Sequence, residues 1–181
     1  MATPRACLYR PAGFTLAEML VTVAVLALAA SIAVSSASPA SSFAVDSAAG
    51  EVTRAIRFAQ REAVRTGTWH VVRFNVAAQS LLVYRLNAAG EQDTVNKVFH
   101  PTSKAEYEIS LRPVGQLASA DFKYKTRPVT NTISFRPDGA PASFNAGVPA
   151  GDLLEVDGKV VLAQGKVQRS VAVARVTGRV F

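Results

Sequence analysis

Two hydrophobic patterns divide the chain. Residues 14–34 form an apolar run of 21 residues that holds no Gly or Pro and a single charge, Glu18. As a helix, this run would span roughly 32 Å at about 1.5 Å per residue, which suffices for a hydrocarbon core of roughly 30 Å. The pattern therefore predicts one membrane-spanning helix. The preceding basic residues, Arg5 and Arg10, predict that the start of the chain stays cytoplasmic and that the rest lies outside.

A helical period resumes after residues 35–42, whose Ser, Ala and Pro content predicts a hinge. Apolar residues then recur every three or four positions, at Val45, Ala48, Val52, Ala55 or Ile56, Ala59 and Ala63. The polar sides carry charged residues, namely Glu51, Arg54, Arg57, Arg61, Glu62 and Arg65. Thr66-Gly67 is typical of a helix end. Residues 35–66 are thus expected to hold a hinge and an amphipathic helix.

From residue 67 the period changes to two. Strands are predicted at 69–75, 80–86, 94–99, 107–111, 132–136, 142–145, 153–156, 159–163 and 169–176. Asp157-Gly158 favours a hairpin between two of them, whereas the mixed polarity of 112–128 predicts a loop. An amphipathic helix needs a sheet to cover its apolar stripe. The expected fold is therefore α+β, with a long N-terminal helix packed on an antiparallel β-rich head at 67–181.

Little in the sequence favours catalysis or a bound metal. The single Cys7 cannot form an internal disulfide, and no Cys or His residues stand at zinc spacing. His70 lies in a predicted strand and His100 before a Pro at a strand end, while Asp138 and Asp157 each precede a Gly, as turn residues do. We therefore expect no enzyme, no cofactor and no metal site.

The presence of Glu18 in the apolar run requires an explanation, because a charge inside a membrane segment costs free energy. Thr15-x-x-Glu18 has the spacing of a capping box, in which Thr15 caps the helix and the carboxylate meets its positive end. A cleaved secretory signal, with cleavage around 36–38, is the alternative for this region. The apolar run is longer than the roughly 7–15 residues of such signals, and its early acid argues further against one.

Gly13-Phe14-Thr15-Leu16-Ala17-Glu18, followed by the apolar run, resembles the class III signal of type IV pilins and type II secretion pseudopilins. The resemblance implies that a prepilin peptidase cuts after Gly13, removes residues 1–13 and methylates Phe14. It also implies that Glu18 pairs with the N-terminal amine of a neighbouring subunit during filament assembly. An acid in lipid is tolerable when such a cation neutralises it.

The head resembles the minor pseudopilin H and FimT-like group (GspH/FimT), through the helix 48–65, Phe135-Arg-Pro-Asp-Gly139 and Thr177-Gly-Arg179. This resemblance implies a minor pseudopilin of the type II secretion pseudopilus that supports protein export across the outer membrane. Its partners would be other pilins, the prepilin peptidase and the inner-membrane assembly platform. Its head would lie in the periplasm.

The alternative is a FimT-like minor type IV pilin that acts in pilus assembly or as a DNA receptor in uptake. The net charge of +7, or +5 without the leader's two arginines, favours acidic partners. Candidate nucleic-acid contacts are Lys123, Lys125, Arg127, Arg175 and Arg179, with Phe122 and Tyr124 interleaved among the first three. Some FimT-like pilins resemble DNA receptors with a C-terminal Gly-Arg-x-Arg, but here Phe181 stands at the second Arg position.

Overall fold

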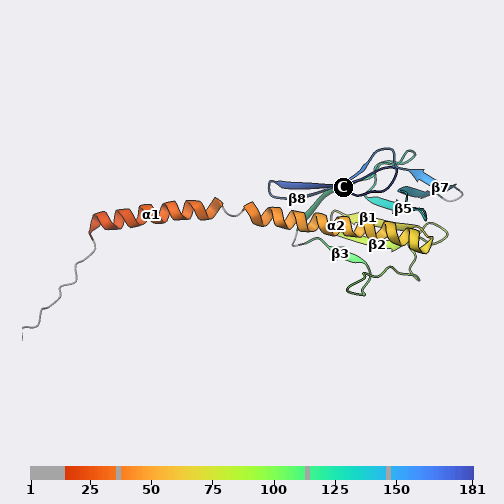
Figure 1. Ribbon diagram of the computed structural model, residues 1–181, viewed down its shortest axis with the longest axis horizontal. Coiled ribbons are helices and arrows are strands. Elements are labelled where there is room, and N and C mark those ends of the chain that lie inside the picture. Colours follow the sequence, from red (N-terminus) through yellow and green to blue (C-terminus); the bar gives the residue numbers. More distant parts are fainter. Residues whose placement is uncertain (1–14, 36–37, 113–114, 146–147) are drawn as a thin grey trace, which may run out of the picture. The chain divides into compact units, whose positions relative to one another are not determined.

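The structure, a computed structural model, describes residues 15–35, 38–112, 115–145 and 148–181. The chain divides into two compact units, residues 1–39 and 40–181. Helix α1 (Leu16–Ser35) belongs to the first unit, and helix α2 (Ser38–Thr66) lies almost wholly in the second (Figure 1). The predicted leader 1–13, with Gly13 and Phe14, lies outside the described residues.

Helix α1 begins as the capping pattern predicts. The backbone N–H of Glu18 donates to Thr15 Oγ1 at 3.3 Å, so Thr15 caps the first turn. Large apolar side chains, such as Leu20, Val23 and Leu26, are exposed along the helix. Among the described residues, no helix combines the length and the apolar character that a membrane crossing requires.

Helix α2 confirms the predicted amphipathic pattern. All the predicted apolar positions are buried, and Ala55 and Ile56 both belong to the core. Pro39 lies in the first turn, where a missing N–H breaks no intrahelical hydrogen bond. The helix ends before Gly67, whose φ of 64° is the left-handed conformation common at helix ends.

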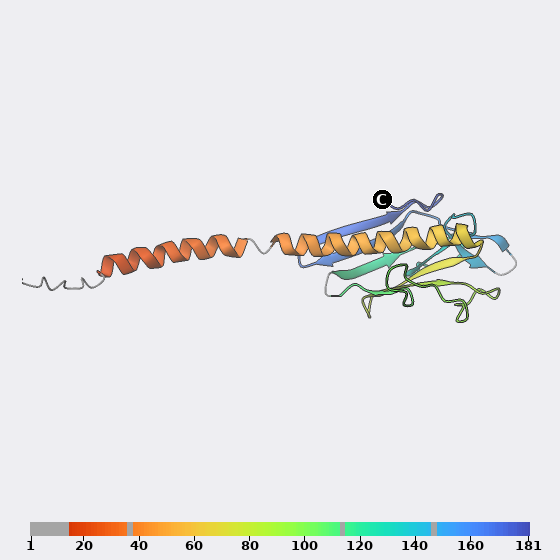
Figure 2. The same cartoon turned by 60° about the horizontal axis from the view of Figure 1, so that its bottom comes forward.

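Nine strands form three small antiparallel sheets within the described residues of the head. Their bounds are β1 (His70–Asn75), β2 (Ser80–Arg85), β3 (Glu108–Ser110), β4 (Gln116–Asp121), β5 (Thr132–Phe135), β6 (Ala142–Asn145), β7 (Val148–Leu153), β8 (Gly158–Gln164) and β9 (Val167–Val173). The orders are β3-β2-β1-β5, β4-β8-β9 and β6-β7. Helix α2 runs along the head with β8 and β9 on one flank and the yellow-to-green strands β1–β3 on the other (Figure 2). The observed architecture is the predicted α+β fold.

One core joins α2 to both larger sheets. Phe74 of β1 stacks on Phe122, which follows β4, with ring centroids 5.8 Å apart. Hydrogen bonds also cross between the sheets: Leu117 of β4 donates its N–H to Gln79 Oε1 at 2.6 Å, next to β2. The head is therefore held by contacts between residues far apart in the sequence.

Three predictions about the strands are wrong. Segment 112–128, predicted as a loop, contains β4, which pairs with β8. Asp157-Gly158 makes no hairpin, because β8 pairs with β4 and β9 while β7 pairs with β6. The expected strand at 94–99 is absent from the described residues of that segment, where Asp93 Oδ1 accepts the N–H groups of Val95 and Asn96 instead. Such local side-chain bonds compete with strand pairing.

Candidate assembly and nucleic-acid interfaces

Glu18, the predicted assembly residue, lies in the first turn of α1 and is exposed. At this position its carboxylate is close to the positive end of the helix. Within the described part of the chain no Lys or Arg forms an ion pair with it. The carboxylate is thus available to a cation from another molecule.

The predicted alternation of cations and aromatic rings around Lys123 is observed, but the rings are not accessible for stacking with bases. Lys123 and Lys125 are exposed, whereas Phe122 and Tyr124 are 0% and 1% exposed. The two aromatic rings fill the core, so they offer no platform for single-stranded nucleic acid. Lys123 Nζ is also within 2.9 Å of Glu155 Oε2, which already balances its charge.

The three arginines among the candidate nucleic-acid residues lie beside different segments of the head. Arg175 donates from Nη1 to the Glu155 carbonyl at 3.1 Å and therefore lies near Lys123. Arg127 donates to the Phe144 carbonyl at 3.0 Å. Arg179 instead lines a hollow beside α2, together with Arg57 and Arg61.

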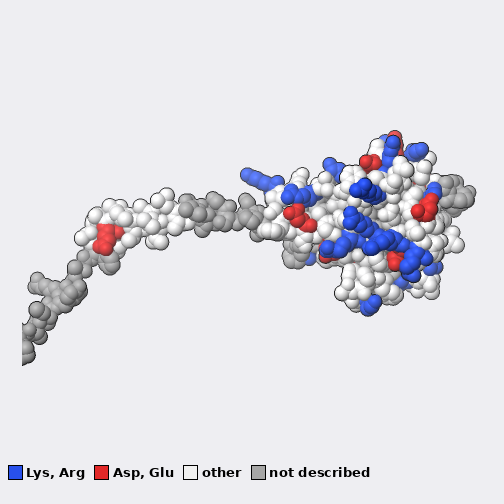
Figure 3. Space-filling model, in the orientation of Figure 1, with Lys and Arg blue, Asp and Glu red and all other residues white. Residues whose placement is uncertain are grey.

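This hollow lies beside a cationic face of α2, on the side of the helix that the sequence pattern predicted only to be polar. It has a volume of about 560 Å³ and is lined by Arg54, Arg57, Gln60, Arg61, Thr177, Arg179 and Val180. Lys and Arg side chains gather in a band over this part of the head (Figure 3). The signal was present in the sequence as the spacing of Arg54, Arg57, Arg61 and Arg65, which places them along one helix face.

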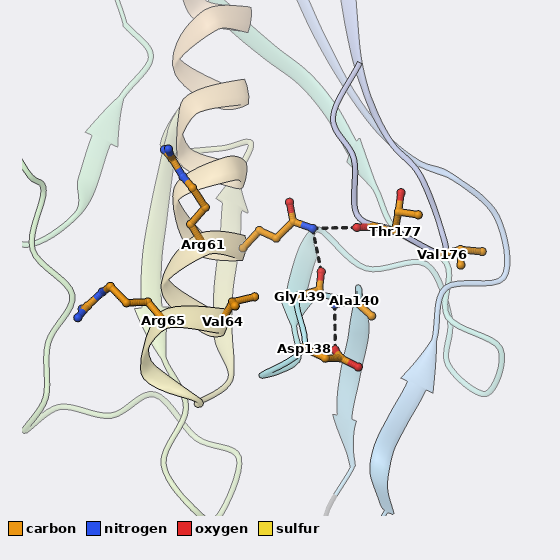
Figure 4. A pocket seen from close by; sticks show the side chains of 9 residues that line it. Arg61, Val64, Arg65, Asp138, Gly139, Ala140, Val176 and Thr177 are labelled. Atoms are coloured by element: carbon orange, nitrogen blue, oxygen red, sulfur yellow. Dashed lines mark hydrogen bonds between the residues drawn. The ribbon is translucent and has the colours of Figure 1, made fainter.

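A second hollow, of about 450 Å³, lies between α2 and the turns at 137–139 and 176–178 (Figure 4). Gln60 Nε2 donates to the carbonyls of Gly139 and Thr177, each at 2.8 Å, and so ties both turns to the helix. Asp138 accepts a hydrogen bond from Arg136 Nε at 3.1 Å, and this contact lowers the pKa of the Asp138 carboxyl. A carboxylate stabilised in this way is a poor general base.

His70, the other candidate for acid–base chemistry, is part of the core. Its side chain is buried, and Nδ1 lies 3.1 Å from the Thr68 carbonyl oxygen. Burial lowers the pKa of His70, because desolvation disfavours the imidazolium. Among the described residues no group of three or more His, Cys, Asp or Glu side chains is placed to hold a metal ion.

Comparison with known proteins identifies two family models along the chain. The prokaryotic N-terminal methylation motif matches residues 9–34, and the type II transport protein GspH matches residues 48–177. Comparison with curated protein sequences gives no match. The GspH model covers most of the chain, and the matches point to structural, pilin-like proteins rather than to enzymes.

A solved structure of a minor pseudopilin shares the fold of this chain. The chain is similar to the minor pseudopilin EpsH of the type 2 secretion system of Vibrio cholerae, with a TM-score of 0.51 and 13% identity over 76% of this chain and 94% of that one. The type IV minor pilin FimU of Pseudomonas aeruginosa gives a TM-score of 0.46 and 18% identity, over 76% of this chain and 86% of that one. The N-terminal motif and the GspH match over most of the chain agree, and the chain belongs to the GspH family of type II transport proteins.

Proposed function

We propose that this chain is a minor pseudopilin, which is made as a precursor, is cut after Gly13 and is methylated on Phe14 by a prepilin peptidase. Residues 14–34 then anchor it in the inner membrane, and the head at 67–181 lies in the periplasm. The observation that carries this proposal is the joint signal at 9–34, where the methylation-motif match contains Gly13, Phe14 and Glu18. The exposed apolar side chains of α1 support it, because a helix that is apolar on several sides needs lipid or other helices around it.

The proposed role is structural. The chain joins a periplasmic pseudopilus with other pseudopilins, on the inner-membrane assembly platform, and the pseudopilus supports export of proteins across the outer membrane. Glu18 directs this step by pairing with the methylated N-terminal amine of a neighbouring subunit. A charge inside a membrane segment costs free energy, so its neutralisation by an amine favours assembly.

Mass spectrometry of the mature protein tests the processing step. A chain that starts at Phe14 and carries one added methyl group supports the proposal. A chain that starts near Ser38, or that retains residues 1–13 in a host with active prepilin peptidase, contradicts it.

The assembly step is tested by Glu18→Ala. This variant should insert in the membrane as well as the native chain or better, because it removes a charge, yet it should be recovered from cross-linked filaments several-fold less. Glu91→Gln is the control, because Glu91 is an exposed acid of the head. Equal incorporation of the Glu18 variant and of this control would exclude the pairing role.

A further inference from the structure

The cationic face of α2 is built around three arginines, Arg57, Arg61 and Arg179, which we call the arginine ladder. All three are exposed, and they line the same hollow beside α2. Arg61 also borders two neighbouring hollows on the head, of about 450 and 340 Å³. The ladder therefore borders a hollowed part of the head surface.

The three guanidinium groups have no carboxylate partner among the residues that the structure describes. Arg57 Nη2 donates to the Val180 carbonyl at 3.2 Å, and Arg61 Nε donates to the Arg57 carbonyl at 3.3 Å. These bonds orient the side chains but bring no negative charge, and no acid lines their hollow. Like charges held together without a counter-charge repel one another, so the surface favours an anion.

The spacing of the ladder fits carboxylates on a helix. Arg57 and Arg61 are four residues apart, which is about 6 Å along α2 at 1.5 Å per residue. Acidic side chains three or four residues apart on another helix have the same separation. The planar guanidinium also matches a carboxylate through two parallel hydrogen bonds, which gives such a contact a defined geometry.

We propose that the arginine ladder binds the acidic face of a helix in a neighbouring pilin subunit of a different kind. This inference rests on the proposed function, since it assumes that other pilins surround the head. A second copy of this chain is a poor partner, because all three acids of its helix α2, Asp46, Glu51 and Glu62, already form ion pairs within their own subunit.

Nucleic acid is the less suitable ligand for this surface. Three cations that contact phosphates would release few counterions from duplex DNA. The logarithm of the binding constant would then fall with the logarithm of the salt concentration with a slope of only about −2.7, and the attraction would be weak. The aromatic rings nearest to the other candidate contacts, Phe122 and Tyr124, are buried. A protein surface with a few well-placed carboxylates matches the ladder better.

The test uses the purified full chain in detergent and a helical, Ala-based peptide with Glu at every third or fourth position on one face. A peptide with Gln at the same positions and a DNA duplex of about 20 base pairs are the comparison ligands. The ladder variant is Arg57→Ala/Arg61→Ala/Arg179→Ala. The control is Lys125→Ala/Lys159→Ala/Lys166→Ala, which removes the same charge from exposed positions elsewhere on the head. Arg61→Glu is a second variant, and the fluorescence of Trp69 checks that each variant is folded.

We expect the Glu peptide to bind the native chain and the control equally, and the ladder variant roughly tenfold more weakly, as for the loss of a few exposed ion pairs. Arg61→Glu, which replaces one cation of the ladder by an acid, should also weaken binding, and the Gln peptide should not bind. Equal binding of the Glu peptide by the native chain and both ladder variants would overturn the proposal. DNA binding that depends on the ladder, without peptide binding, would instead show a nucleic-acid surface.

The same variants in cells separate this inference from the proposed function. The ladder variant should be recovered several-fold less from sheared filaments, together with a smaller yield of cross-links to other pilins. If Glu18→Ala stays out of the filaments while the ladder variant enters normally, the ladder proposal is wrong and the proposed function stands. If the native chain never enters filaments, the proposed function fails, and peptide binding alone decides what the ladder recognises.

Discussion

The side chain of Gln79 forms the buried hydrogen bonds that connect the two larger sheets. It lies just before β2, is 7% exposed and has a φ of 56°. Its Oε1 accepts the N–H of Leu117 at 2.6 Å, and its Nε2 donates to the Leu117 carbonyl at 3.0 Å. One buried amide thus satisfies both backbone groups of a β4 residue.

Gln79→Ala should destabilise the head by about 2–4 kcal/mol. The substitution leaves the N–H and the C=O of Leu117 without these partners in the interior, and an unsatisfied buried group costs about 1–3 kcal/mol. Ala occupies a φ of 56° no better than Gln does, so the backbone gives no compensation. Gln79→Gly loses the same bonds but relieves the backbone, and should be less destabilising than Ala by about 1 kcal/mol.

Urea unfolding, followed by the fluorescence of Trp69, measures this effect, because Trp69 is the only tryptophan of the chain and contacts Phe144 in the head. The midpoint for Gln79→Ala should fall by about 1–2 M, given typical slopes of about 1–3 kcal/mol per M. Gln116→Ala, at an exposed neighbour of Leu117, should leave it almost unchanged. A midpoint for Gln79→Ala equal to that of this control would refute the bonding role of Gln79.

Two further substitutions test the core. Burial lowers the pKa of His70 below its ordinary value of about 6.5, so the unfolded chain binds a proton first as the pH falls. The contribution of His70 to the free energy of unfolding should therefore be complete above about pH 7. It should decrease as the pH falls through about 6.5, by at most about 1.4 kcal/mol per pH unit. His70→Asn should remove that slope in urea titrations between pH 5 and pH 8, whereas the lowered pKa of Glu62 affects stability only below about pH 4.5. Gly158→Ala should cost about 1–3 kcal/mol in the same assay, because its Cβ would lie 2.4 Å from the Phe122 ring. Gly165→Ala, where nothing lies within 4 Å, should cost only about 1 kcal/mol from its φ of 60°, and equal losses for the two variants would contradict the packing argument.

The amphipathic helix and the first hairpin were predictable because their signals are local. The buried residues of α2 follow one helical period, and β1 and β2 pair in register from His70–Arg85 to Asn75–Ser80, as the alternating pattern indicates. Such patterns depend only on which face of an element meets the core.

The position of β4 and the role of Gly158 depend instead on contacts between distant residues. Strand β4 is stabilised by β8 more than thirty residues later, which no local period can indicate. Gly158 is not followed by a turn. The position needs a residue without a side chain because the Phe122 ring packs on its backbone. The dipeptide Asp-Gly therefore favours a hairpin locally. In the fold, the same glycine instead allows the Phe122 ring to approach the backbone closely.

The contacts of the candidate cations could not be predicted from the sequence for the same reason. Lys123 and Arg175 meet through Glu155, whereas Arg179 lies with residues of α2 that precede it by more than a hundred positions. Spacing along the sequence identified the cations of one helix face but not the C-terminal residue beside them. Only the fold brings these two segments together.

The C-terminus itself explains why Arg179 belongs to the helix surface rather than to a free arm. Phe181 exchanges two backbone hydrogen bonds with Ala172 of β9, at 2.8 and 3.0 Å, and Val180 is buried against the core. Arg57 donates to the Val180 carbonyl and Gln60 to the Thr177 carbonyl, so α2 contacts the tail on both sides of Arg179. An arginine held in this way adds its charge to the face of α2 at a set position. Its partner is therefore expected to be a surface of matching, regular spacing.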